Sequence, residues 1–237
     1  MARGYPDFSP GVARDIDGRF LQTIAEAPVW FYDDFETPVK LWYQSGGTSY
    51  LVTTGAIGAF SSYVYSGAGS LYIITPVFGP SQTGILLSTP PSINRIGIMM
   101  NFKYVDADHY FNSPGAMRLI ELNYFTGTKL KVAIISYNPN TGNWYLSVDN
   151  GATMTLIVTK AVNDVSWHFI KLVVDLDNNR YRTLRINNIE YDISAYAVHN
   201  VANLGDNAFD LNILLGSSVA NQAELWVDNY KVTYGEI

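Results

Sequence analysis

Short runs of strand-forming residues, separated by turn residues, dominate the sequence from Val29 onward. About thirteen such runs are rich in Val, Ile, Thr, Tyr and Trp, and each is bounded by Gly, Pro, Asn, Asp or Ser. In the run WHFIKLVVDL, Ile170, Leu172 and Val174 recur with the period of two that a half-buried strand shows. No run in this region has a convincing helical period. The chain is therefore predicted to be all-β, with many short antiparallel strands in a sandwich or barrel.

The residues between these runs are typical of tight turns. Asn138 to Gly142 predict a hairpin loop, and Asp149-Asn150-Gly151 tolerate positive φ. Asn187-Asn188, between two short runs, predicts a two-residue turn. Turn chemistry thus agrees with the antiparallel interpretation.

Residues 1–28 differ in character from the rest. The segment contains several Pro and Gly residues, and four apolar side chains recur at intervals of four: Val12, Ile16, Phe20 and Ile24. This spacing places them on one side of a short helix. We therefore divide the chain into an N-terminal arm, 1–28, that docks on a neighbour or on the body through these four residues, and a single β-sandwich domain, 29–237.

Composition excludes several classes of protein. Charged residues make up 15% of the chain, against about 25% in ordinary soluble domains. The net charge of −6 argues against a nucleic-acid partner, which requires a basic face. No apolar run approaches the length of a membrane helix, and the absence of cysteine excludes disulfides. The first twenty residues lack the pattern of a signal peptide, so none is expected in this chain.

Four segments carry a family resemblance: FYDDFE (31–36), SGAGSLYI (66–73), the meander at 166–192, and AELWVDNYKVTYG (223–235). Together they resemble concanavalin A-like jelly rolls of the laminin-G-like and carbohydrate-binding-module type. The resemblance implies an antiparallel jelly-roll β-sandwich. It is specific to architecture and says little of activity.

The catalytic members of this family provide a test for enzymatic activity. Their glucanases carry Glu-x-Asp-x-x-Glu on one strand, so that one acid protonates the leaving oxygen and another attacks or activates water. None of the six glutamates of this chain has that spacing, and no other catalytic motif is present. We therefore expect no enzymatic activity.

Aromatic residues beside the Asn-rich loop at 138–143 are candidates for stacking on a sugar. We predict a glycan platform at Trp144, Tyr145 and Tyr137. Ordinary cross-strand packing is the alternative for each of them. Tyr43, Tyr63 and Tyr65 are further aromatic candidates.

Carboxylates near the two ends of the domain are candidate metal ligands. First and last strands of jelly rolls often lie side by side, and related modules hold calcium near them. Asp34, Glu36 and Asp228 would then supply oxygen ligands to a structural calcium ion, which takes six to eight. The alternative is that these acids are solvated or bind turns through hydrogen bonds.

Three functions compete on this basis. We favour a non-enzymatic structural protein of a virion, such as a capsid decoration, capsid-associated or tail protein, which is anchored by the arm and contacts other protein subunits or further copies of itself. Low charge favours this interpretation because a charge-poor surface is suited to burial in an assembly. The alternative is an extracellular carbohydrate-binding module or lectin-like domain, and the third is a polysaccharide-active enzyme.

Overall fold

The structure is a computed structural model that describes residues 27–36, 42–46, 48–53, 64–66, 69–75, 80–87, 95–105, 117–164, 166–203, 208–216 and 223–236. Most of the predicted N-terminal arm, with Val12, Ile16, Phe20 and Ile24, lies outside the described residues. The docking of that arm therefore stays a prediction.

The described residues form sixteen strands in two antiparallel sheets and no helix. The first sheet contains, in spatial order, β13 (Ile189–Asp192), β12 (Arg180–Ile186), β11 (His168–Asp175), β6 (Arg95–Val105), β16 (Glu224–Tyr234), β4 (Gly69–Ile74) and β3 (Thr48–Thr53), with β1 (Val29–Asp33) also paired to β16. The second sheet contains β10 (Met154–Thr159), β9 (Asn143–Ser147), β8 (Lys129–Asn138), β7 (Met117–Phe125), β15 (Ala208–Gly216), β5 (Pro80–Leu87) and β2 (Trp42–Gly46), with β14 (His199–Ala202) also paired to β8.

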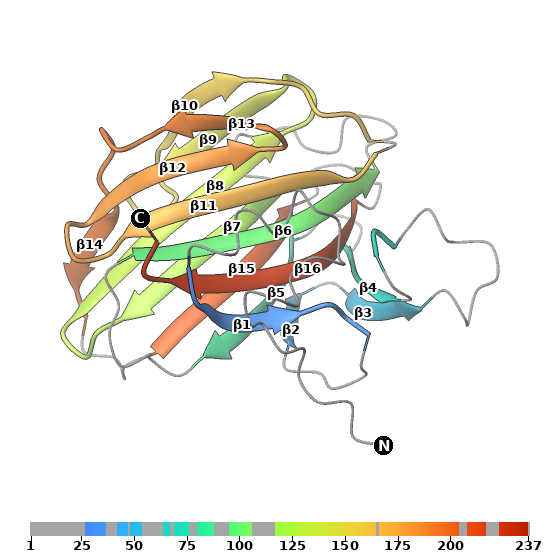
Figure 1. The fold of residues 1–237 in the computed structure, drawn as a ribbon, viewed down its shortest axis with the longest axis horizontal. Coiled ribbons are helices and arrows are strands. Elements are labelled where there is room, and N and C mark those ends of the chain that lie inside the picture. Colours follow the sequence, from blue (N-terminus) through green and yellow to red (C-terminus); the bar gives the residue numbers. More distant parts are fainter. Residues whose placement is uncertain are drawn as a thin grey trace.

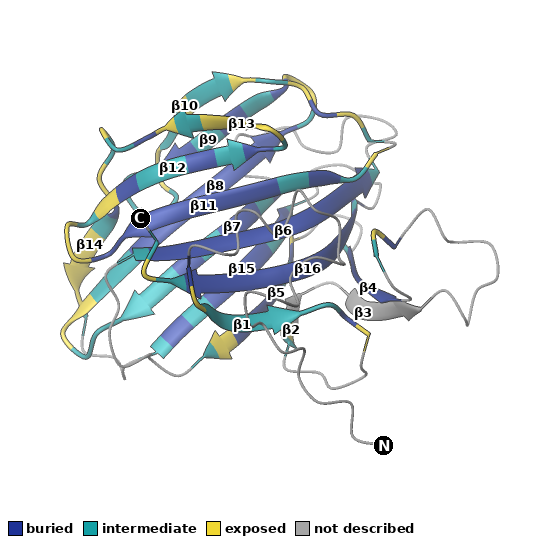
Figure 2. Ribbon diagram, in the orientation of Figure 1, coloured by how far each residue is buried: buried dark blue, intermediate teal, exposed yellow. Residues whose placement is uncertain are grey.

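The two sheets lie face to face as the layers of a sandwich (Figure 1). Apolar side chains from both sheets fill the space between them in one large cluster. The central strands β6, β11 and β16 are buried along most of their length, whereas β10, β13 and β14 are half-buried or exposed (Figure 2). The predicted all-β jelly-roll sandwich is confirmed.

Alternation within each strand explains why this sequence forms two layers. In β11, Ile170, Leu172 and Val174 are fully buried in the core, as their spacing predicts. Successive side chains of a strand point to opposite faces, so one apolar set is sufficient to bury one face of a sheet. Each layer therefore has a second face that the core does not use.

The predicted turns are confirmed. Asn138 ends β8 and Asn143 begins β9, so the Asn-Pro-Asn-Thr-Gly segment joins them as a hairpin loop. Asn150 and Asn187 adopt positive φ, 62° and 53°, in the other two predicted turns. Asparagine tolerates this region better than other residues with a side chain, which is why it recurs at these positions.

The first and last strands of the described chain are neighbours. β1 pairs antiparallel with β16, with Phe31 opposite Val232 and Asp33 opposite Tyr230. The short strand β14 lies beside β8, with His199 opposite Val132 and Ala202 opposite Lys129. Among the described residues, no helix is long and apolar enough to cross a membrane.

One buried tyrosine joins the two sheets through polar contacts. The hydroxyl of Tyr181, on β12, accepts the N–H of Ile134 at 2.9 Å and donates to the carbonyl of Ser147 at 2.6 Å, both in the opposite sheet. The side chain is fully buried. Its hydroxyl thus satisfies a backbone donor and a backbone acceptor that water does not reach.

Replacing Tyr181 with Phe will therefore destabilise the fold by about 1–3 kcal/mol, because two buried backbone groups lose their partner. Urea unfolding measures this as a lower midpoint. Tyr191→Phe, a half-buried tyrosine on β13 that packs on the same core, is the matched control and will shift the midpoint by much less. Equal midpoints for the two variants would contradict the assignment.

Candidate functional site

The second sheet presents polar side chains on the face that points away from the core. On β15, Phe209 and Leu211 are core residues, so Asp210 and Asn212 point to the opposite face. On β7, Leu122 is in the core, and Glu121 and Asn123 point away from it. β15 and β7 are hydrogen-bonded neighbours, which brings the four polar side chains together.

A bulge in β7 adds an arginine to this group. The register of β7 shifts between Arg118 and Ile120 against β8, and the same region is irregular against β15. A bulge inserts one extra residue, so residues three apart can lie on the same face. Arg118 and Glu121 thereby form an ion pair, with Nη1 and Oε2 2.8 Å apart.

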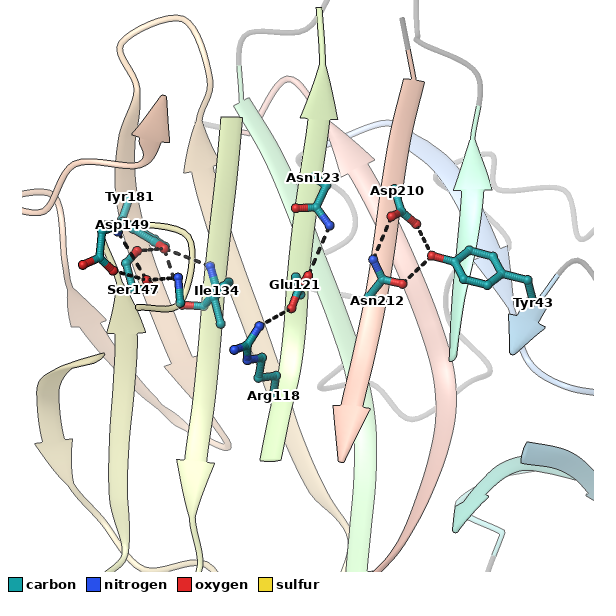
Figure 3. Close-up of polar contacts among 11 residues, drawn as sticks. Tyr43, Arg118, Glu121, Asn123, Ile134, Ser147, Asp149, Tyr181, Asp210 and Asn212 are labelled. Atoms are coloured by element: carbon teal, nitrogen blue, oxygen red, sulfur yellow. Dashed lines mark hydrogen bonds and ion pairs between the residues drawn. The ribbon is translucent and has the colours of Figure 1, made fainter. Parts of the chain in front are cut away.

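Cross-strand register aligns these residues in a row across the sheet. Tyr43 on β2 is opposite Gly84 on β5, Gly84 is opposite Asn212, and Asn212 is opposite Glu121. Beside this row, Asp210 lies between Leu86 and Asn123. We call this surface the polar face and define it as Tyr43, Gly84, Arg118, Glu121, Asn123, Asp210 and Asn212. Figure 3 shows all of these except Gly84.

The ring of Tyr43 lies across the sheet and reaches two strands away. Its hydroxyl donates to Oδ1 of Asp210 at 2.5 Å and is 2.6 Å from Oδ1 of Asn212 (Figure 3). The ring crosses Gly84, where an added Cβ would be 2.9 Å from Cζ of Tyr43 and 2.8 Å from the carbonyl oxygen of Leu211. The absence of a side chain at Gly84 is therefore what lets the ring lie on the sheet.

Both carboxylates of the polar face accept two hydrogen bonds. Asn212, fully buried, donates to Oδ2 of Asp210 at 2.9 Å, and Tyr43 donates to Oδ1. Glu121 accepts Arg118 on Oε2 and the amide of Asn123 on Oε1 at 3.2 Å. Burial, and then the hydrogen bond and charge of Asp210, raise the pKa of Tyr43 above its usual range, so its hydroxyl stays a donor.

A turn closes one end of the row. The row continues from Glu121 through Ile134 on β8 to Ser147 on β9. Ser147 Oγ accepts the N–H of Gly151 at 2.7 Å, and Asp149 accepts the N–H of Thr153, which fixes the turn after β9. An added Cβ at Gly151 would be 2.9 Å from Nη2 of Arg118, so the guanidinium lies against this turn.

The predicted glycan platform is wrong for two of its three residues. Trp144 and Tyr137 are both fully buried in the core, where their rings lie 4.6 Å apart. Trp144 Nε1 donates to the carbonyl of Lys160, and Tyr137 donates to the carbonyl of Val162. Their rings are therefore covered by protein and cannot stack on a sugar.

Tyr145, the third residue of that platform, points to the face that carries Arg118. It lies between Trp144 and Leu146, both core residues, and is half-buried. Register places it in line with Arg118, two strands along the sheet. Its hydroxyl accepts the amide of Asn143 at 3.1 Å. A role for Tyr145 in binding stays a prediction.

The predicted calcium ligands Asp34, Glu36 and Asp228 are not assembled into a metal site. In the part of the chain that the structure describes, no group of three or more His, Cys, Asp or Glu could hold a metal ion. Asp34 Oδ1 accepts the N–H of Glu36 at 3.2 Å, and Glu36 Oε1 accepts the N–H of Gly69 at 3.1 Å. These carboxylates thus bind turns, which was the alternative interpretation. Calcium binding by the whole chain stays a prediction, which melting curves in EDTA and in calcium test.

Asp228 is the most deeply buried of the three carboxylates. Its Oδ2 accepts the N–H groups of Tyr65 and Ser66 at 3.0 and 2.9 Å, and its Oδ1 accepts that of Asn229 at 2.7 Å. Burial raises the pKa of Asp228 to about 7, although these hydrogen bonds oppose the shift. The side chain therefore holds residues 65 and 66 against β16.

Sequence reasoning noted Tyr43 but missed its partners. Glu121 and Asn123 alternate with core residues, as do Asp210 and Asn212, and this pattern of polar residues two apart is visible in the sequence. Their meeting depends on the pairing of β7 with β15, which are distant in the chain. Local pattern carries no information on such a pairing.

Comparisons with known proteins define the fold. No protein-family model matches the chain, and no curated protein matches it in sequence. Solved structures do match. Peanut lectin is 9% identical, with a TM-score of 0.52, and the match covers 87% of this chain and 97% of the lectin. The lectin UEA-II, solved in complex with galactose, is 9% identical, with a TM-score of 0.50 and coverage of 86% and 97%.

A carbohydrate esterase, vb_24B_21 from the Shiga toxin-encoding bacteriophage phi24B, is 12% identical, with a TM-score of 0.50 and coverage of 86% of this chain and 96% of that one. At such low identities these similarities concern the fold. The chain has a concanavalin A-like jelly-roll β-sandwich fold, as its four sequence segments predicted.

The buried position of Asp228 predicts a specific pH dependence of stability. Because its pKa in the fold is raised from 3.8 to about 7, its contribution to stability is complete below pH 4 and is lost as the pH rises through 7. The free energy of unfolding of the wild type, minus that of Asp228→Asn, will therefore be smaller at pH 8 than at pH 5. Urea unfolding at both values measures it, and other titrating groups cancel in the difference. A pH-independent difference would contradict the prediction.

Proposed function

We propose that the chain is a non-enzymatic carbohydrate-binding protein that uses the polar face of its second sheet. The observation that supports this most directly is the ring of Tyr43, which lies on the sheet over Gly84 with its hydroxyl held by Asp210. The C–H groups of a sugar ring form an apolar surface that packs on an aromatic ring, while its hydroxyls need polar partners at the edge. The polar face offers both within a few ångströms.

The hydrogen-bonding groups beside the ring suit sugar hydroxyls. Carboxylates accept the strongest hydrogen bonds available to a neutral donor. Asp210 is hydrogen-bonded to Tyr43, and Glu121 lies opposite Asn212 on the neighbouring strand β7. Asn123 adds an amide that can both donate and accept. Ligand sites commonly combine aromatic surface with a few such fixed polar groups.

The same contacts favour binding over hydrolysis. A glycosidase needs one carboxyl that offers its proton to the leaving oxygen while a second attacks or activates water. On the polar face all four oxygens of Asp210 and Glu121 accept hydrogen bonds from neighbouring groups. Neither carboxyl is arranged to donate a proton.

The comparisons support carbohydrate binding better than the virion role. Of the three matching structures described above, two are lectins, one of them solved in complex with galactose, and one is named a carbohydrate esterase. This chain is similar to that phage esterase in fold alone. The phage origin of the esterase therefore does not support a virion location for this chain. The virion role, the protein subunits as partners and the place of the chain in the cell stay predictions.

Replacing Tyr43 with Ala will weaken binding to a glycan array and raise the dissociation constant for the strongest glycan by at least about tenfold, or 1.4 kcal/mol. Tyr43→Phe keeps the ring but loses the bond to Asp210, so its affinity will lie between those of Tyr43→Ala and the wild type. Ile189→Ala is the control, because Ile189 on β13 is 43% exposed, against 38% for Tyr43, and lies in the other sheet. Unchanged binding by Tyr43→Ala, with the fold intact by melting temperature, would refute the proposal.

A further inference from the structure

The only guanidinium of the polar face is held by a carboxylate of the same face. Arg118 Nη1 lies 2.8 Å from Oε2 of Glu121, and the two side chains are 23% and 12% exposed. Nη2 packs against Gly151, while Nε is buried with no hydrogen-bond partner. The positive charge of Arg118 is thus balanced before any ligand arrives.

The polar face is therefore negative as a whole. It carries the two carboxylates of Glu121 and Asp210 and the single cation of Arg118, which Glu121 already pairs. The partners of Asp210, Tyr43 and Asn212, are neutral. The net charge of the whole chain, which includes this face, is −6. A ligand that brings a further carboxylate or sulfate to this surface meets like charge, which is unfavourable.

The hydrogen-bonding capacity that remains on the two carboxylates of this face is that of an acceptor. Each oxygen of a carboxylate has two acceptor positions, and on Asp210 and Glu121 one bond per oxygen is accounted for by the contacts described above. A ligand fills the remaining acceptor positions when it donates hydrogen bonds to them. Sugar hydroxyls donate, whereas a uronate carboxylate or a sulfate ester has no proton to give.

From this balance of charge and hydrogen bonding we infer that the polar face selects neutral, hydroxyl-rich glycans and rejects anionic ones, with Glu121 determining this selectivity because it neutralises Arg118. The inference rests on the proposed carbohydrate-binding function and specifies its ligand class. Glu121 acts through Arg118, which without it would be a ready partner for a uronate or sulfate group, since a guanidinium binds such oxygens in a bidentate manner.

The test uses the full chain and polysaccharide pairs that share a backbone and differ in charge: methyl-esterified and de-esterified homogalacturonan, hydroxyethylcellulose and carboxymethylcellulose, and xylan and glucuronoxylan. Affinity electrophoresis or biolayer interferometry at low salt measures binding to each. We expect the wild type to bind the neutral member of at least one pair about tenfold more tightly than its anionic partner, the order of one contact between unit charges in water.

The variant Glu121→Gln frees Arg118 and removes one negative charge. Its affinity for the anionic member will rise about tenfold relative to the wild type, and the double variant Glu121→Gln/Arg118→Gln will lose that gain. Glu190→Gln, an exposed glutamate on β13, makes the same change in net charge away from the polar face and will leave binding unchanged. A gain that persists without Arg118 would refute the role of Glu121.

The outcomes separate this inference from the proposed function. If the wild type binds the anionic members as tightly as the neutral ones, the inferred selectivity is refuted, whereas the proposed carbohydrate binding is supported. If it binds no member of any pair and no glycan on the array, the proposed function fails and the inference fails with it.

Discussion

The alternation of side chains along each strand is the constraint on which the rest of this structure depends. One face of every central strand has to be apolar, because apolar side chains of both sheets fill the space between them as the main core. The opposite face is then free of that demand. On β15 the core side is Phe209 and Leu211, and the side that is left carries Asp210 and Asn212. The polar face is thus a by-product of how the sandwich buries its interior.

Alternation also explains which predictions from sequence succeed. Ile170, Leu172 and Val174 lie in the core as their period indicates, and asparagines mark the turns. The same rule, applied to β9, would have corrected the predicted glycan platform. Trp144 and Leu146 are two residues apart and both point into the core, so only Tyr145, between them, points to the opposite face. The position of a residue in the alternation of its strand predicts its exposure better than its distance in sequence from a polar loop.

Two features could not be predicted from the sequence: the pairing of strands that are distant in the chain, and bulges within a strand. Asp210 meets Asn123 because β15 pairs with β7, and no local pattern specifies that pairing. Arg118 joins Glu121 only because a bulge in β7 changes the parity between them. The carboxylates near the domain ends show the converse. They were conspicuous in sequence, but Asp228 and Glu36 are occupied by backbone N–H groups of nearby segments.

Gly84 has a consequence for how tightly a ligand could be held. A side chain there would lift the tyrosine from β5, so the height of the ring above the backbone is set by direct contact with the strand. A surface built on a strand in this way loses little motional freedom when it is occupied, in contrast to an aromatic side chain carried on a loop. Preorganisation of this kind improves affinity because the entropy of ordering has been lost already during folding. If the polar face binds a sugar as proposed, the absence of one methyl group at Gly84 thus favours binding by fixing the tyrosine ring in advance.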